Sequence, residues 1–324
     1  MSVKPFRFAV TPPTKATPLT DWKQALHRIE DMGFDTVVIA DHFTDGYEME
    51  PFVAMTAIAM ETTRLKVQSG VLGNDYRHPV QVHRAAAMLD VISEGRLILG
   101  LGAGWMTSDY ESAGLALDPP GVRVSRFAEA VAIIKGLFGP EPFSYAGQYY
   151  EIRSLNGLPK PVHPAGPKFF IGGGSQRVLG IAGREADIVG INAALTAGEL
   201  GRHAVVDLAL DRVEQKIEWV RAGAEKAGRR LDDLELEMNV WLVRVAPDSA
   251  SAVDFRERMA KRFDVTPELL KESPSVLIGT LEECIDTLVE RRERLGINHF
   301  QLDAGFPPQD VEALAPIVAR LAGS

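Results

Sequence analysis

The sequence predicts an α/β fold, a (β/α)8 TIM barrel with inserted loops and a small hairpin. Short apolar segments that suit strands buried on both faces alternate with helical segments along all 324 residues. Eight such strands are expected, and several end in glycines or polar residues. No linker or low-complexity segment interrupts this pattern. We therefore expect one domain over residues 1–324, with insertions near 105–122, 143–152 and 193–204.

The expected strands are apolar runs that stop at turn residues. They cover residues 6–10, 36–40, 65–72, 97–101, 168–171, 187–191, 234–245 and 299–302. Residues 143–152 alternate around Ala146-Gly147 and predict a hairpin between barrel units. The alternative architecture is a doubly wound open sheet. Its G-x-G-x-x-G motif is absent after the first strand, and the even spacing of the strands favours the barrel.

The expected helices carry apolar residues at helical spacing, with start and stop signals at their ends. The first runs from Thr20 as N-cap to Gly33, and Pro79 occupies the first turn of a helix that ends near residue 92. Thr280 and Glu283 form a capping box for a helix over 281–294. The other helices are expected over 51–61, 126–138, 176–185, 205–227, 249–263 and 311–321.

Composition excludes several classes of function. The net charge of −9 argues against nucleic acid or an anionic membrane as the main partner, because both bind basic surfaces. The single cysteine, Cys284, excludes an intramolecular disulfide, and its helical spacing predicts a core residue rather than a nucleophile. No apolar run is long enough to span a membrane. The first strand starts too early for a secretion signal, so we expect a cytoplasmic enzyme.

In a barrel of this class the active site lies at the carboxyl ends of the strands. Strand two delivers Asp41 and His42 to that end. A carboxylate neighbour favours the imidazolium and can fix its tautomer, which suits a proton donor or acceptor. We therefore expect Asp41 and His42 to be catalytic. The alternative is that Asp41 caps the following turn while His42 only packs.

Two glycine-containing strand ends predict a ligand that approaches the backbone. Gly172-Gly173-Gly174-Ser175 leads into a helix, whose free N–H groups bind phosphate, and Arg177 stands in its first turn. The alternative is a tight turn with Ser175 as N-cap. Ser69-Gly70-Val71 ends strand three, where the glycine marks either a bulge under a flat ligand or a simple strand end.

A substrate pocket is expected around Trp105, Asn74 and Asn192. Trp105 follows the strand-four glycines, and a large aromatic at that position suits the wall of a ring-binding pocket. The two asparagines follow strands three and six. No histidines have the spacing and carboxylate company of metal ligands, so we expect no metal.

Five segments together resemble the bacterial luciferase-like monooxygenase superfamily, and in particular its branch that uses the deazaflavin coenzyme F420. The resemblance runs from Phe6 to about Leu321. Its most specific parts are GFDTVVIADHF (33–43), the long stretch ending in RLILGLGAGW (62–105), PPGVRVSRFAEAV (119–131), GQYYEI (147–152) and PKFFIGGGSQRVLGIAGREADIVGIN (167–192).

This resemblance implies a cofactor in the barrel mouth, F420 or alternatively FMN. Its ring is expected against a non-prolyl cis peptide at Gly70–Val71, and its phosphate at Gly173, Gly174 and Ser175. The full set of expected cofactor contacts is Ser69, Gly70, Val71, Ala103, Gly104, Gly172, Gly173, Gly174, Ser175 and Arg177. The anionic tail of F420 requires a cationic rim, for which the sequence offers Arg177, Arg202 and His203. Residues 193–204 are expected to form a lid.

The resemblance also implies the class of reaction. Asp41 and His42 match an Asp-His pair that lies beside the ring in sugar-phosphate dehydrogenases of this branch. Trp105 stands where those enzymes carry a catalytic glutamate, which puts glucose-6-phosphate oxidation in doubt and favours a flatter or more apolar substrate. We expect an F420-dependent oxidoreductase that transfers a hydride to or from a small organic molecule. The alternatives are an FMN-dependent monooxygenase and a non-catalytic cofactor-binding protein. Relatives often dimerise, so a homodimer is expected.

Overall fold

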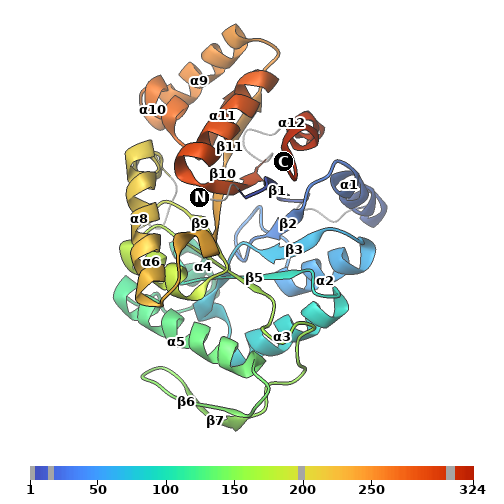
Figure 1. The fold of residues 1–324 in the computed structure, drawn as a ribbon, viewed down its shortest axis with the longest axis vertical. Coiled ribbons are helices and arrows are strands. Elements are labelled where there is room, and N and C mark those ends of the chain that lie inside the picture. The colour runs from blue at the N-terminus through green and yellow to red at the C-terminus, as the bar shows by residue number, and fades with distance from the viewer. Residues whose placement is uncertain (1–3, 14–17, 196–200, 304–310) are drawn as a thin grey trace.

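The structure, a computed structural model, describes residues 4–13, 18–195, 201–303 and 311–324. Parallel strands form a closed barrel in which β3 pairs with both β2 and β5 (Figure 1). The barrel strands are β1 (Arg7–Val10), β2 (Thr36–Ile39), β3 (Lys66–Ser69), β5 (Leu97–Gly102), β8 (Lys168–Gly173), β9 (Ile188–Ile191), β10 (Glu235–Val240) and β13 (Ile297–Leu302). The predicted (β/α)8 barrel is therefore confirmed.

Helices that follow the strands surround the barrel (Figure 1). They are α1 (Leu19–Asp31), α2 (Pro51–Glu61), α3 (Pro79–Ile92), α5 (Pro120–Phe138), α6 (Gln176–Glu185), α8 (Leu210–Lys226), α11 (Leu281–Leu295) and α12 (Ala315–Leu321). Their apolar faces pack on the outside of the strands, and one large hydrophobic cluster joins both layers. Within the described ranges, no helix is both long and apolar enough to cross a membrane.

Additional elements interrupt the barrel pattern at several points. The expected hairpin is present as β6 (Phe143–Ala146) and β7 (Glu151–Leu155), and α4 (Thr107–Ala113) lies in the expected insertion after strand four. A further insertion after β10 was not expected, although the helix over 249–263 within it was predicted and is confirmed. It comprises β11 (Leu242–Val245), α9 (Ser249–Phe263), α10 (Pro267–Glu272) and β12 (Val276–Gly279). The hairpin and this insertion lie at opposite ends of the long axis (Figure 1).

The predicted strand over 234–245 is wrong in its second half. β10 ends at Val240, Trp241 lies outside both ladders, and β11 pairs with β12 in a separate two-stranded sheet. The inserted elements have their own small core, which includes Leu242, Phe255 and Leu270. Because an apolar run suits both burial sites, the sequence pattern does not show where the chain leaves the barrel.

Three other predicted boundaries are also wrong. Helix α1 starts after Pro18, whose extended conformation places Thr20 inside the first turn rather than at the N-cap. The helix expected over 205–227 is divided into α7 (Arg202–Asp207) and α8, because Ala209 is extended. The strand expected over 65–72 ends at Ser69 and resumes as the two-residue β4 (Leu72–Gly73) after a cis peptide.

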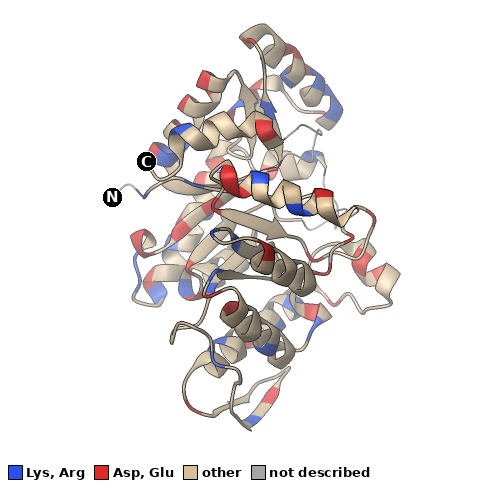
Figure 2. Cartoon of the chain, turned by 90° about the vertical axis from the view of Figure 1, so that its right-hand side faces the viewer, with Lys and Arg blue, Asp and Glu red and all other residues tan. Residues whose placement is uncertain are grey.

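The amino ends of the strands are closed by a network of charged side chains. Arg7 contacts both Asp35, at 2.6 Å, and Glu235. Lys66 contacts Asp35 at 2.7 Å, and Lys168 contacts Glu235 at 2.7 Å. Burial alone would raise the pKa of Asp35, but Arg7 and Lys66 hold it well below its usual value. Elsewhere, charges of both signs are spread over the outer helices, whereas the central strands carry few (Figure 2).

Candidate functional site

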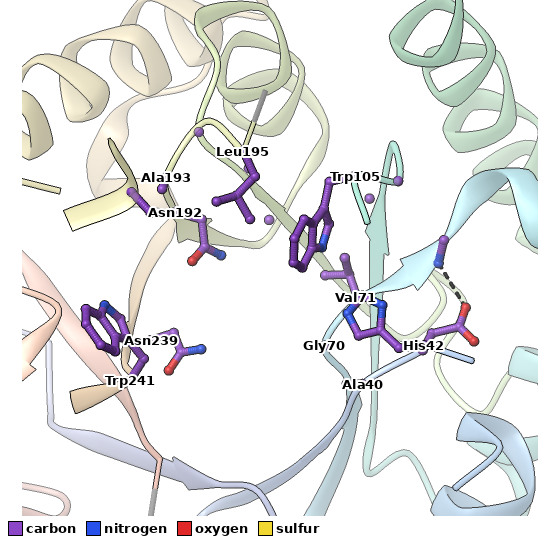
Figure 3. Close-up of a pocket in the computed structure, with 18 of the residues that line it drawn as sticks. Ala40, His42, Gly70, Val71, Trp105, Asn192, Ala193, Leu195, Asn239 and Trp241 are labelled. Atoms are coloured by element: carbon purple, nitrogen blue, oxygen red, sulfur yellow. Dashed lines mark hydrogen bonds between the residues drawn. The ribbon is translucent and has the colours of Figure 1, made fainter. Parts of the chain in front are cut away.

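A cavity of about 700 Å³ opens at the carboxyl ends of the barrel strands. Trp105 and Trp241 lie on opposite sides of it, with His42 on the Trp105 side (Figure 3). Asn192 and Asn239 point into the space between these walls (Figure 3). This volume is typical of a small-molecule site, and its position is the one that barrel enzymes use.

Most of the residues predicted from strand ends line this cavity. They are Asp41, His42, Gly70, Val71, Ala103, Gly104, Trp105, Gly172, Gly173, Gly174, Ser175 and Asn192. Three predicted residues lie elsewhere. Ser69 is fully buried behind the wall, Asn74 donates to Asp75 in the turn before α3, and Arg177 is an exposed residue of α6.

The strand-three bulge has the predicted geometry. The Gly70–Val71 peptide is cis, so this prediction is confirmed. Ser69 ties the bulge to β5, because its hydroxyl donates to the Gly100 carbonyl and accepts from the Gly100 N–H, both at 2.9 Å. A Cβ at Gly100 would lie 1.7 Å from the Ser69 carbonyl oxygen, so only glycine allows this approach. Ser69 therefore positions the backbone instead of facing a ligand.

His42 is held by a carboxylate that the sequence analysis missed. Its Nδ1 lies 2.6 Å from Oδ2 of Asp109, which is fully buried on α4. The Tyr76 hydroxyl donates to the same oxygen at 3.0 Å, and burial together with Asp109 raises the pKa of Tyr76 well above its usual value. Because a carboxylate only accepts, Nδ1 of His42 donates and Nε2 is the nitrogen left for a ligand.

The expected pairing of Asp41 with His42 is wrong. Asp41 accepts from Arg77 at 2.6 and 3.0 Å and from the Gly73 N–H at 2.9 Å. A bidentate guanidinium and a backbone donor satisfy most of its acceptor capacity. Asp41 therefore fixes the turn after the bulge. The signal for Asp109 was hidden, because it stands in a short helix that the sequence pattern did not predict.

Aromatic rings surround His42 on the same wall. Its ring centroid lies 4.5 Å from that of Tyr47 and 5.5 Å from that of Trp105, the latter in an edge-on arrangement. Across the cavity, the β10–β11 junction and the end of α9 contribute Trp241 and Phe263, with centroids 5.2 Å apart. These rings suit a flat or apolar ligand better than a sugar phosphate.

The Gly172–Ser175 loop contains the turn and N-cap that the sequence offered as one of its two interpretations. Ser175 caps α6 by accepting from the Val178 N–H, which leaves earlier N–H groups of the helix for an anion. A Cβ at Gly173 would lie 2.4 Å from Val178, and one at Gly174 would lie 2.2 Å from the Ala193 backbone. These glycines are thus required for packing whether or not a phosphate binds.

A buried lysine fixes this loop from behind. Lys216 of α8 donates to the Gly174 carbonyl at 2.6 Å and to Asp207 at 2.8 Å. The same Asp207 oxygen accepts from the Ala194 N–H at 2.8 Å. The loops that follow β8 and β9 are thereby held together at the cavity wall.

Arg123 lines the cavity, whereas Arg177 does not. Arg177 donates to the Gly121 carbonyl and to the Ser125 hydroxyl, both on the neighbouring helix α5. Arg123, also on α5, lines the cavity and donates to the Gly104 carbonyl at 2.6 Å. Its buried Nε has no partner in the part of the chain that the structure describes. Arg123 precedes the expected helix start, so the sequence pattern gave no reason to place it at the cavity.

The predicted tail rim and lid are only partly described. Residues 196–200 of the expected lid lie outside the described residues. Arg202 is exposed and donates to the Asp264 carbonyl at 2.8 Å, while Gly201 and Ala204 line the cavity. Among the described residues, no group of three or more His, Cys, Asp or Glu side chains is arranged to hold a metal ion.

The sequence matches the model of a known protein family. The family model described as luciferase-like monooxygenase matches residues 1–264. An F420-dependent glucose-6-phosphate dehydrogenase of Kribbella flavida is 25% identical over 91% of this chain and 92% of its own length. A 4-hydroxyprotoasukamycin monooxygenase of Streptomyces nodosus subsp. asukaensis is 25% identical over 83% of this chain and 75% of its own.

Solved structures share the same fold. An F420-dependent secondary alcohol dehydrogenase in complex with an F420-acetone adduct superposes with a TM-score of 0.77. The alignment covers 98% of each chain at 21% identity. Such a likeness establishes the common architecture.

Proposed function

The chain belongs to the luciferase-like monooxygenase family, and we propose that it is an F420-dependent oxidoreductase acting on a small organic molecule. The observation that carries this proposal is the aromatic-walled cavity at the carboxyl ends of the strands, in which the Gly70–Val71 bulge lies beside His42 and its buried partner Asp109 (Figure 3). F420-dependent dehydrogenases among the relatives favour the deazaflavin over FMN.

The cavity wall fits a flat tricyclic ring with a phosphorylated chain. Gly70, Val71, Ala103, Gly104 and Gly172 line the cavity with backbone and small side chains. Val71 packs there against an apolar cluster of Ile98, Phe170 and Ile188. The Gly172–Ser175 loop and Arg123 would hold the phosphate. When bound, the deazaflavin supplies the carbon that exchanges a hydride with the substrate.

The side chains of this protein would orient the substrate and handle a proton. His42, with its Nδ1 fixed by Asp109, would accept or deliver a proton at Nε2. Trp105, Tyr47, Trp241 and Phe263 would exclude water and hold a flat molecule against the ring. The mainly aromatic walls favour an uncharged substrate.

Titration of the purified protein with F420 and with FMN, followed by fluorescence, tests the cofactor. We expect F420 to bind more tightly. Its affinity should fall as salt is added, because its anionic tail needs cations near the mouth of an acidic protein. Replacing Arg123 by Met should weaken both cofactors, because both carry the phosphate. Tight FMN binding without F420 binding would overturn the choice and favour an oxygen-activating monooxygenase. F420 binding without turnover of any substrate would favour a binding protein.

We further propose that the enzyme works in the cytoplasm as a homodimer. Helices α2 and α3 pack side by side and expose large apolar side chains. Val53 is 70% and Met60 71% exposed on α2, while Met88 and Val91 are 47% and 41% exposed on α3. Apolar groups gathered on two adjacent helices are typical of a protein interface.

A further inference from the structure

The floor of the cavity is polar, unlike the usual interior of such a barrel. Branched apolar side chains ordinarily fill this space. Here Gln68 of β3 and Glu237 of β10 line the cavity while only 1% and 2% exposed. Asn239, two residues after Glu237 on β10 and therefore on the same face of the strand, also lines the cavity. Three polar side chains thus occupy buried positions inside the barrel. Their burial costs folding free energy unless a ligand or water forms hydrogen bonds with them.

Glu237 has no cation or hydrogen-bond donor among the described residues, and burial alone raises its pKa to about 8. Opposite it on β9 stands Gly190, where a Cβ would lie 3.0 Å from Oε2 of Glu237. The same Cβ would lie 2.3 Å from the Phe170 ring of β8. The two neighbouring elements therefore leave room for the carboxyl group without offering it a charge.

The titratable neighbour on β13 is neutral. His299 stands in register with Glu237, and burial lowers its pKa to about 3. Two residues earlier on β10, Glu235 is engaged by Arg7 and Lys168, which also hold its pKa below the usual value against the effect of burial. The other titratable or cationic groups around the cavity are Asp41, His42, Tyr47, Tyr76, Arg123, Arg262 and Asp303.

Acceptors without partners lie on the same floor. Oε1 of Gln68 and Oδ1 of Asn239 are buried and have no hydrogen-bond partner among the described residues. These amide oxygens accept, whereas a protonated carboxyl group donates. A carboxylic acid kept neutral by an apolar site is an effective donor to a carbonyl oxygen. A neutral Glu237 therefore supplies the donor for an uncharged acceptor oxygen, whereas the oxygens of Gln68 and Asn239 accept only from a donor. Once ionised, Glu237 repels an anion.

We propose that Glu237 is a hydrogen-bond donor on the cavity floor that selects substrates presenting an uncharged acceptor oxygen, such as ketones, aldehydes or enones. This inference rests on the proposed function only in taking the cavity as the substrate site. Carboxylate and phosphate groups gain no cation there. Glu237 therefore defines a substrate class that the aromatic walls alone do not specify.

The protonation of Glu237 is tested by infrared difference spectroscopy of the protein without any cofactor. At about pH 6.5, below the pKa of about 8, the wild type should show a carbonyl-stretch band of a protonated carboxylic acid. Glu237→Gln should remove this band. The matched control is Glu235→Gln, which removes an ion-paired carboxylate of the same strand and should leave the band intact. Persistence of the band in Glu237→Gln overturns the proposal.

Selection is tested with two probes of the same shape. Acetophenone carries an acceptor oxygen, and α-methylstyrene carries a methylene group in its place. Dissociation constants are measured by ligand-observed NMR, with and without saturating F420, at about pH 6.5 and about pH 9.5, either side of the pKa. At the lower pH the wild type should prefer acetophenone by about tenfold, the size of one net hydrogen bond. At the higher pH the preference should disappear.

Two variants of Glu237 distinguish the effect of its hydrogen-bond donor from the effect of its side-chain shape. Glu237→Gln keeps a donor that does not titrate, so it should retain the preference at both pH values. Glu237→Leu has no donor and should lose the preference at both. Retention of the preference in Glu237→Leu, or the lack of any preference in the wild type, overturns the proposal. Failure of F420 to bind would refute the proposed cofactor but would leave the cofactor-free result valid.

Discussion

At the scale of single residues, the buried pair of His42 and Asp109 is the feature that turns a cavity into a candidate catalytic centre. Replacing His42 by Ala should lower turnover by about 10²–10⁴-fold, the usual value of general acid–base help. Asp109→Asn should lower it by at least about tenfold. Both carboxylate oxygens accept, Oδ1 from the Phe43 N–H and Oδ2 from His42, so an amide that keeps the first bond turns an NH2 donor toward Nδ1. Steady-state kinetics and pH profiles with F420 measure both effects.

The matched control for this pair is Tyr76→Phe. It removes a donor to Asp109 and leaves the contact between His42 and Asp109 in place. Turnover of this variant should stay within a few-fold of the wild type. Cofactor affinity should change little in all three variants. Wild-type turnover in His42→Ala would show that His42 only packs.

The burial of Glu237 should also make the free energy of unfolding depend on pH. Its pKa is about 8 in the folded protein and near 4.5 in the unfolded chain. Between these values the folded state holds a proton that the unfolded state has lost, so rising pH favours unfolding. Wild-type stability should fall across this window relative to Glu237→Gln by a few kcal/mol, at about 1.4 kcal/mol per pKa unit. Urea unfolding at about pH 5, 7 and 9 measures it; parallel curves for both proteins would contradict it.

At the scale of elements, the sequence located strand ends better than it located side-chain partners. Apolar runs and glycines mark where strands stop, so residues 70–71, 103–105 and 172–175 were correctly expected at the cavity. The partner of His42 was missed because it comes from another loop, and pairing across loops leaves no local pattern. Ser69 was misjudged because a hydroxyl at a strand end can bond the neighbouring strand instead of a ligand.

The link between the loops after β8 and β9 gives a prediction at this scale. Lys216→Met leaves the Gly174 carbonyl and Asp207 without their buried donor. Removing one partner of a fully buried ion pair costs about 3–5 kcal/mol, and the loss here should be smaller because Arg212 still lies 3.3 Å from Asp207. Thermal unfolding should shift to lower temperature and cofactor affinity should fall. Lys226→Met, at the exposed end of the same helix, is the control and should change neither. Equal behaviour of both variants would show that Lys216 does not support the site.

At the scale of the whole molecule, even spacing of strands and helices sufficed to predict the barrel, and the resemblance of five sequence segments predicted the family. The insertion after β10 could not be predicted, because its small core uses the same apolar and helical patterns as the barrel itself. This insertion forms part of the site. The chain leaves the barrel at Trp241, and the end of α9 brings Phe263 to the cavity. One wall of the pocket therefore comes from a segment outside the (β/α)8 repeat.

The association of two copies is the remaining property of the whole molecule that the structure allows us to predict. The sequence pattern of α2 is apolar almost all round, yet one side of the helix faces solvent with Val53 and Met60 exposed. An apolar surface of this kind is stabilised when a second copy covers it. We expect a dimer by light scattering, and a monomer for the double variant Met60→Glu/Met88→Glu, because two buried charges on each copy would cost several kcal/mol. Val253→Glu, equally apolar and 47% exposed on α9, is the control and should remain dimeric. A wild type that is monomeric at all concentrations, or a double variant that stays dimeric, would exclude this face as the interface.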